Sequence, residues 1–252
     1  MLSVVGEPIW LAVNIGFPLF SSFSMALLYK SAGTASLMGF AVLGGIMISF
    51  WGSVLWSMAS QFNWDKQVGL FEIYLTSPAP ISAILIGMSV GGIVNTAPSA
   101  VIVAALGWFI FNPVINPAWA ALILTFALTL ASLYAMGMVL SALYLAYGRE
   151  AETINDALHE PVSVMSGVYF PSIGSASPFP FLVQAIASVI PLTVGMDALR
   201  RTLFFSQGIS AIYPHLIALS AMSLALLLIA SRAMLALENK GRRDGTLTVR
   251  LR

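Results

Sequence analysis

The chain has 252 residues, of which 59% are hydrophobic and only 8% are charged. A soluble domain carries charges on about a quarter of its residues, so this composition excludes a water-soluble protein and predicts a helical membrane protein. The net charge of +1 excludes a nucleic-acid partner. Because there is no cysteine, disulfides and thiolate metal sites are excluded as well.

The uncharged stretches of the chain indicate how often it crosses the membrane. A helix needs about 20 apolar residues to cross the hydrocarbon. The first, second and last stretches suit one crossing each, and the third suits two, because two prolines and two asparagines in residues 111–117 predict a turn. The stretches are residues 8–29, 31–64, 73–148, 161–196 and 202–231.

The fourth stretch is interrupted by five prolines, beginning at Pro161. It predicts one broken span that ends near Phe170, followed by short helices over residues 171–210 that re-enter the membrane or lie at its interface. The expected fold is a single all-α integral membrane domain over residues 1–252. It has six transmembrane helices, with a broken fifth span and short outer re-entrant helices before the sixth.

The charges also predict the orientation. Six crossings place both termini on one side, and the basic tail 238–252 assigns that side to the cytoplasm by the positive-inside rule. We therefore expect a multi-pass plasma-membrane protein with both termini cytoplasmic. Residues 62–80 and 147–157 are then cytoplasmic, and residues 30–36, 111–118 and 171–210 lie outside.

The chain lacks a phosphate-binding loop of its own. Such a loop needs glycines followed by a lysine and a hydroxyl residue, but only Lys30 precedes a hydroxyl residue, and Tyr29 stands where the glycine is required. We expect no catalytic residue, metal or cofactor in this chain. Any ATP-driven function needs ATP and magnesium bound by a partner chain.

One enzyme motif does occur, because residues 87–91 fit the G-x-S-x-G pattern around Ser89. The pattern requires a strand-to-helix turn, whereas these residues lie in a predicted span, where small residues four apart favour helix packing. An intramembrane serine hydrolase is therefore a weak alternative.

Residues 64–78 predict an amphipathic helix between the second and third spans. Trp64, Val68, Phe71 and Leu75 are spaced to lie on one face of it. It is either a connector lying on the lipid headgroups or a docking helix that transmits motion from a partner.

A second constellation precedes the last span. It consists of Ser-Gly-Val-Tyr-Phe-Pro at 166–171, Ile-Pro-Leu at 190–192 and Met-Asp-Ala-Leu-Arg-Arg at 196–201. Together, these two regions resemble the permease subunits of ABC type-2 exporters. Such permeases carry Gly-x-x-Phe-Pro, Pro-Leu and Asp-Ala-x-Arg in this order. They also carry an acid, Gly-Thr and Glu before a Ser-Pro after span two, where this chain has Leu70 in place of the threonine.

The resemblance implies a half-transporter, in which two permease chains, identical or different, line one pathway and each docks on a separate ABC ATPase subunit. The coupling helix, about residues 62–78, would contact the ATPase through Asp65, Val68, Gly69, Phe71, Glu72, Leu75, Ser77 and Pro78. The outer re-entrant gate would comprise Gly167, Tyr169, Phe170, Pro171, Pro191, Asp197, Arg200 and Arg201.

Physical chemistry adds an expectation for the arginine pair. An arginine in bare hydrocarbon costs roughly 3 kcal/mol on insertion scales, so we expect Arg200 and Arg201 at the outer interface. There Asp197 is spaced to pair with both on the same helix face.

Two further groups of polar residues are candidates. Glu152, Asp156 and Glu160 form an acidic helix face, which is either a solvated extension, a second cytoplasmic contact or an inner gate. Asn14 and Asn95 are the polar residues placed deepest in the spans, and each either bonds to a neighbouring helix or faces a cavity in the pathway.

The function expected is the permease subunit of an ATP-driven exporter embedded in the lipid bilayer. Because its spans carry almost no charge, the substrate is expected to be amphipathic or hydrophobic, such as a drug, an antibiotic or a lipid. A lipid-linked polysaccharide is the alternative within the same family. An ion-coupled secondary transporter is the alternative of another class, but it requires a charged residue at mid-membrane, which the uncharged stretches do not supply.

Overall fold

The computed structural model describes residues 8–61, 64–65, 68–70, 73–74, 81–147, 151–174 and 177–244. Over these residues the chain is helical and contains no strand. The helices are α1 (Pro8–Ser31), α2 (Met38–Gly52), α5 (Ile81–Phe111), α6 (Trp119–Tyr147), α7 (Ala151–Met165), α8 (Phe181–Ala187), α9 (Pro191–Phe204) and α10 (Ile209–Asp244). A short 3-10 turn, η2 (Ala35–Leu37), precedes α2, and a π-helical segment, η3 (Ser53–Ala59), continues it.

Four helices in the described part are long and apolar enough to cross a membrane. They are α2 with η3, α5, α6 and α10, and the bent pair α8–α9 raises the count to five if it forms one span. The chain is thus an all-α protein with the helices of a multi-pass membrane protein. The prediction of six crossings is met only in part.

The two remaining predicted spans account for the difference. α1 has 24 residues but is not among the four, and several side chains of its first turns lie outside the described part. α7 has 15 residues, about 22 Å of helix, which is too short for a hydrocarbon layer of about 30 Å. It ends at Met165 rather than near Phe170, and Pro161 lies within it instead of breaking it.

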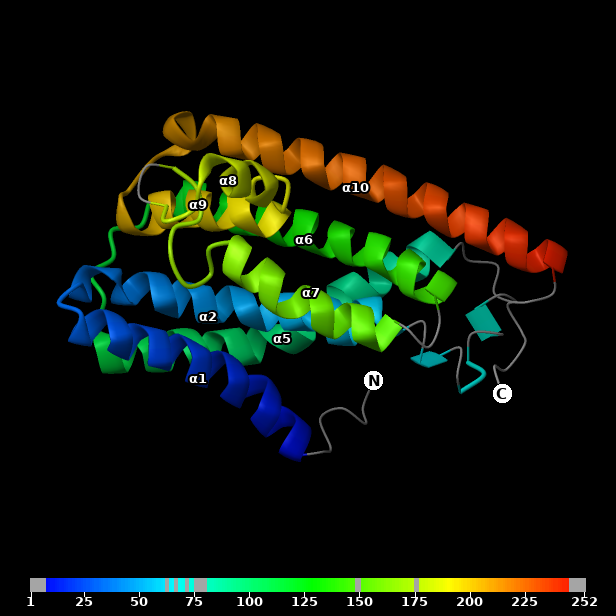
Figure 1. Ribbon diagram of the computed structural model, residues 1–252, viewed down its shortest axis with the longest axis horizontal. Coiled ribbons are helices and arrows are strands. Elements are labelled where there is room, and N and C mark those ends of the chain that lie inside the picture. The colour runs from blue at the N-terminus through cyan, green and yellow to red at the C-terminus, as the bar shows by residue number, and fades with distance from the viewer. Residues whose placement is uncertain are drawn as a thin grey trace.

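The loops gather at two opposite ends of the bundle (Figure 1). The α1–α2, α5–α6 and α9–α10 connections lie together at what we name the Asn112 end. The end of η3, the end of α6, the start of α7 and the end of α10 lie at the other, which we name the Asp65 end. This grouping matches the two sets of segments that the sequence assigned to opposite sides of the membrane.

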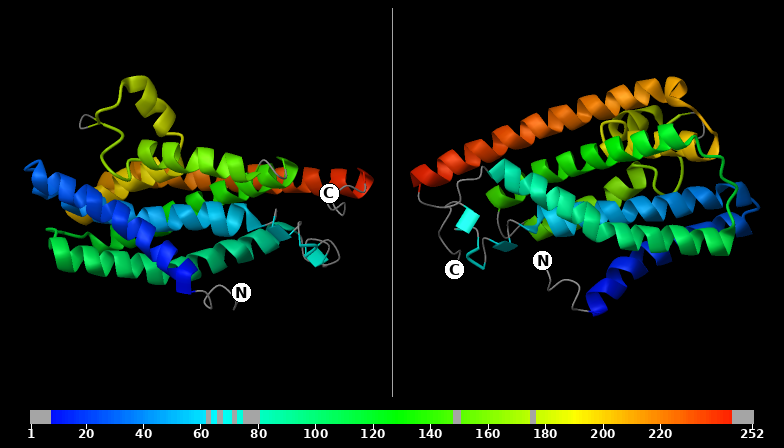
Figure 2. Two further views of the ribbon diagram at one scale, coloured as in Figure 1. Left: turned by 60° about the horizontal axis from the view of Figure 1, so that its bottom comes forward. Right: turned by 180° about the vertical axis from the view of Figure 1, so that it is seen from behind.

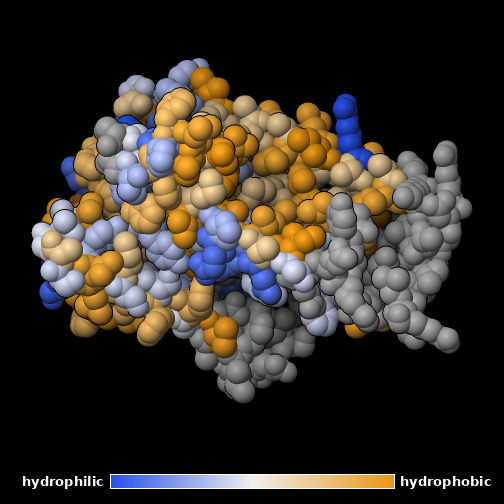
Figure 3. All heavy atoms as spheres, viewed as in Figure 1, coloured by the Kyte–Doolittle hydropathy of each residue, from blue (hydrophilic) through white to orange (hydrophobic). Residues whose placement is uncertain are grey.

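The helix formed by α2 and η3 is the centre of the bundle. It packs against α1, α5, α6 and α9. In an apolar stretch of 18 residues, 83% of its residues are buried, against 22% in such a stretch of α10. Its sequence is apolar all round, as expected of a helix without a solvent face. Figure 3 shows that apolar residues also cover most of the described surface on one face of the bundle, as contact with lipid requires.

The π-helical turn η3 has side-chain support for its backbone. The Ser60 amide donates to the carbonyl of Leu55, five residues earlier, at 3.1 Å, and Ser141 of α6 donates from Oγ to the Met58 carbonyl at 3.2 Å. Single π-helical turns are rare and concentrate at functional sites. Here the turn leads directly from the buried α2 to the segment that contains Asp65.

Candidate functional site

The segment before the last span forms a sharply bent helix pair. α8 and α9 meet at 97°, and α8 stands out from the bundle with the loop before it (Figure 2, left). The bend follows from the sequence, because Ile190 is extended before a proline and Pro191 begins α9, where its missing amide is not needed. Pro191 and most of α9 are buried against α6 and α10.

A turn at Gly167 ends α7. Gly167 has φ +79°, a left-handed conformation that glycine adopts without strain, and a Cβ there would lie 2.7 Å from Ser172 Oγ. Two residues after Gly167, the carbonyl group of Tyr169 accepts a hydrogen bond from α1, because the Tyr29 hydroxyl donates to it at 2.6 Å. Ser21 of α1 also donates to the Tyr169 hydroxyl at 3.2 Å.

Arg200 joins α9 to this turn. It donates a hydrogen bond from Nη2 to the carbonyl of Gly167, and its guanidinium lies 5.0 Å from the ring centre of Phe40 on α2. That Arg200 lies at the depth of the outer interface stays a prediction, but its side chain is only 4% exposed and so does not face lipid or water. The turn carbonyl and the Phe40 ring give it a protein environment instead.

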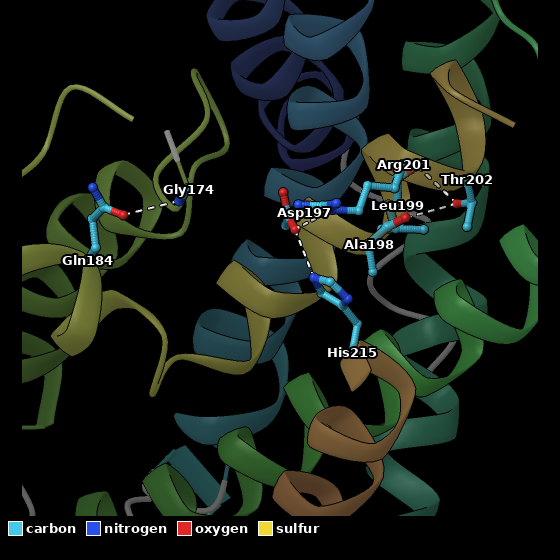
Figure 4. A network of polar contacts seen from close by, with 8 residues as sticks. All are labelled: Gly174, Gln184, Asp197, Ala198, Leu199, Arg201, Thr202 and His215. Atoms are coloured by element: carbon cyan, nitrogen blue, oxygen red, sulfur yellow. Dashed lines mark hydrogen bonds and ion pairs between the residues drawn. The ribbon is translucent and has the colours of Figure 1, made fainter. Parts of the chain in front are cut away.

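Asp197 is the centre of a second polar group on α9. Its Oδ2 accepts from Arg201 Nε at 2.7 Å and lies 2.8 Å from His215 Nε2 of α10 (Figure 4). The predicted pairing of Asp197 with Arg201 is confirmed, whereas Arg200 turns to Gly167 instead. Sequence reasoning missed His215, although a signal existed. Asp197 and His215 lie at similar distances on either side of the short α9–α10 connection, so antiparallel packing brings them face to face.

The last carbonyls of α9 are capped by another loop. The Asn116 amide donates to the Leu203 carbonyl and the Ala118 amide to the Thr202 carbonyl, both at 2.9 Å. Helix ends need such partners for their free carbonyls. The α5–α6 loop and the end of α9 are therefore fixed to each other.

At the opposite end, Asp65 is the centre of a buried cluster. It is 3% exposed and accepts from Gln61 Nε2 at 2.8 Å and from the Tyr74 hydroxyl at 2.9 Å. Burial, together with the hydrogen bond and the negative charge of Asp65, raises the pKa of Tyr74 to about 12. Tyr74 is therefore a protonated donor throughout the neutral range.

The predicted continuous helix over residues 64–78 differs from the structure. Residues 68–70 form a turn in which Gly69 has φ +81°, so the helical turn at Trp64 ends there in the manner of a glycine C-cap. Trp64, Val68 and Leu70 are all exposed. The predicted contacts Phe71, Glu72, Leu75, Ser77 and Pro78 lie outside the described residues.

The remaining candidates do not converge on one place. Asp156 and Glu160 of α7 are exposed, and the side chain of Glu152 lies outside the described part, as does that of Asn14. Asn95 of α5 is exposed on the surface of the chain rather than bonded to a neighbouring helix. Phe170 and Pro171 are half-buried.

Two negative observations concern the described residues only. Ser89 lies inside α5, and its Oγ donates to the Leu85 carbonyl at 2.8 Å, so the G-x-S-x-G pattern is not at a turn. No group of three or more metal-ligating side chains is present in the ranges that the structure describes.

Comparison of the chain with known protein families, with curated proteins and with solved structures found no match.

Proposed function

We propose that the chain is the membrane-spanning subunit of an ATP-driven exporter in the plasma membrane, with six crossings and both termini in the cytoplasm. Two such chains form one pathway, and each docks on a separate ATPase subunit that binds ATP and magnesium. The substrate is amphipathic or hydrophobic, such as a drug, an antibiotic or a lipid. A lipid-linked polysaccharide is the alternative cargo for the same machine.

The observation that carries this proposal is that one buried helix touches both candidate sites. Near the Asn112 end, a Cβ on Gly44 of α2 would meet the Val168 carbonyl, and Phe40 lies against Arg200. At its other end the helix continues into Gln61, which bonds to Asp65. A displacement of Asp65 is therefore carried along α2 and η3 to the Gly167 turn.

This connection suggests how an external ATPase works the chain. ATP binding in the partner presses on the exposed turn at Val68 and moves the Asp65 cluster behind it. The close contacts of α2 then shift the Gly167 turn, and Arg200 makes α9 move with it. The chain itself supplies a lever and an outer gate but no chemistry.

A second function is favoured by a specific observation, the contact between Asp197 and His215. The carboxylate and the imidazole lie 2.8 Å apart on two helices of the membrane bundle, and ion-coupled carriers place such ionisable side chains within their spans. If α8 and α9 form one broken span, Asp197 lies within it and His215 lies on the next span, α10. A carrier of this kind works without an ATPase subunit.

Matched surface variants test the proposal. Val68→Glu places a charge on an exposed turn at the Asp65 end, and Val114→Glu makes the same change on the α5–α6 loop at the Asn112 end, where the side chain is 91% exposed. In mild detergent, we expect an ATPase to co-purify with the wild type and with Val114→Glu but not with Val68→Glu.

Reconstitution into vesicles separates the two functions. Under our proposal, substrate moves only when the ATPase subunit and ATP are present. Transport by the chain alone, driven by an imposed pH gradient and lost in His215→Phe, would overturn the exporter and support the carrier. Retention of the ATPase by Val68→Glu would refute the docking role of the turn.

A further inference from the structure

α5 presents a polar side chain at mid-length on an outward face. Asn95 lies in the middle of Ile81–Phe111 and, at 1.5 Å per residue, more than about 20 Å from either end of the helix. Its side chain is exposed and makes no hydrogen bond to any other described residue. On a membrane-crossing helix, this position faces the hydrocarbon.

Hydrocarbon is a poor environment for such a group. An amide leaves its hydrogen bonds to water behind and gains none from lipid chains, so it is costly unless a polar partner meets it. The other peripheral span, α10, has no such problem, because its outward residues at mid-length are apolar: Ile217, Ala221, Leu224, Ala225 and Leu228. The outward face of α5 therefore differs from that of α10, because it carries a polar side chain that contact with lipid does not stabilise.

We propose that the α5 face around Asn95 packs against the same face of a second copy of this chain, with Asn95 bonded to Asn95 of that copy. Two copies inserted with the same topology are related by a two-fold axis along the membrane normal. A residue near that axis meets its own counterpart at the same depth. An amide carries both donors and an acceptor, so it is complementary to itself.

The residues beside Asn95 permit a close approach. A Cβ on Gly87, two turns earlier on α5, would have no atom within 4 Å, and Val90 and Val94 are exposed by 56% and 67%. Small side chains let two helix backbones come near enough for a hydrogen bond between them. The inference rests on the proposed function only in taking the second chain of the pathway to be an identical copy.

Single cysteines test the contact directly, since the wild-type chain has none. Val94→Cys lies beside Asn95, and Leu224→Cys on α10 is the matched control, because their wild-type side chains are exposed by 67% and 64%. With the protein in lipid vesicles and a membrane-permeant oxidant, we expect Val94→Cys to form disulfide-linked dimers and Leu224→Cys to remain monomeric on a denaturing gel.

A second variant tests the amide itself. We expect Asn95→Leu to weaken self-association about threefold to tenfold, measured by energy transfer between labelled copies as lipid dilutes them. Leu224→Val, an apolar change on the outward face of α10, should leave self-association unchanged. This measurement needs neither the ATPase nor the substrate.

The outcomes separate this inference from the transport proposal. Equal cross-linking of Val94→Cys and Leu224→Cys, no cross-linking of Val94→Cys, or unchanged association of Asn95→Leu would overturn the contact. If the ATPase still co-purifies in that case, the exporter proposal stands and only the α5 interface is wrong. If Val94→Cys cross-links and no ATPase co-purifies, the α5 interface stands and the exporter proposal is wrong.

Discussion

Arg200 of α9 bonds to the backbone carbonyl of Gly167, which lies 33 residues earlier in the chain. The bond ties the turn at the end of α7 to α9, the second helix of the bent α8–α9 pair. The Gly167 carbonyl accepts this bond from a residue far away in the sequence. Both depend on the tertiary fold, which makes the pair a sensitive point for substitution.

We expect Arg200→Met to lower the stability of the purified protein by about 2 kcal/mol, because the buried Gly167 carbonyl then loses its donor. Arg200→Lys should lower the stability as well, since an ammonium group cannot both stack on Phe40 and donate to the Gly167 carbonyl as a planar guanidinium does. Thermal unfolding in detergent measures both. An unchanged melting temperature in Arg200→Met would show that the bond contributes nothing.

Two glycines of α2 give a matched pair for the contact between α2 and the Gly167 turn. We expect Gly44→Ala to destabilise the protein, by about 1–3 kcal/mol or more, because its methyl group would clash with the backbone carbonyl of Val168. Gly52→Ala should be neutral or stabilising by up to about 1 kcal/mol, since no atom lies within 4 Å of its Cβ and alanine is the better helix former.

Chemical denaturation of both variants measures this difference. Equal stability of Gly44→Ala and Gly52→Ala would mean that α2 is not in close contact with Val168. The proposed transmission of motion from Asp65 to the Gly167 turn would then lose this contact.

The ionisation of Tyr74 reports on the Asp65 cluster. Burial, together with the hydrogen bond and the charge of Asp65, raises the pKa of Tyr74 from the usual 10.0 to about 12, so protonated Tyr74 contributes stability that is fully present below pH 10 and is lost as the pH rises through 12. We expect the phenolate absorbance that Tyr74→Phe removes to titrate near pH 12.

Asp65→Asn provides the control for this titration. It removes the negative charge beside the phenol, so the pKa of Tyr74 should fall back toward 10 while the burial remains. A difference titration with its midpoint at 10 in the wild type would contradict the buried Asp65–Tyr74 contact.

We expect Asp197→Ala to destabilise the protein by about 1–3 kcal/mol, because Arg201 and His215 both lose their acceptor. Asp156→Ala is the matched control, since that aspartate is exposed on α7, and it should change stability by less than about 0.5 kcal/mol. Urea titrations of the two variants check the difference, and equal effects would rule out a structural role for the Asp197 group.

Features that depend on local sequence were predictable. The prolines and asparagines after Phe111 predicted the α5–α6 turn, and α5 ends at Phe111 with Asn112 at φ +40°. The spacing of Asp197 and Arg201 predicted their ion pair. The uncharged stretches predicted a membrane protein, and they matched the grouping of the loops at two ends.

Features that depend on tertiary contacts were not predictable from the sequence. Pro161 was expected to break a span, but α7 continues through it, and the nearby His159 carbonyl accepts from Trp51 Nε1 and Ser163 Oγ. The burial of Arg200 depends on a carbonyl that only the folded turn supplies. The π-helical turn accepts a hydrogen bond from a hydroxyl group of another helix, that of Ser141 on α6, which no local pattern reveals.

The capping of α9 by the α5–α6 loop also bears on how the protein is made. The amides of Asn116 and Ala118 leave the ribosome long before the carbonyls of Leu203 and Thr202 that they will meet. During biogenesis, the amides of the α5–α6 loop must therefore stay bonded to water until α9 has been inserted beside them. Truncated chains that end before α9 should consequently be poor substrates for assembly and good ones for membrane proteases.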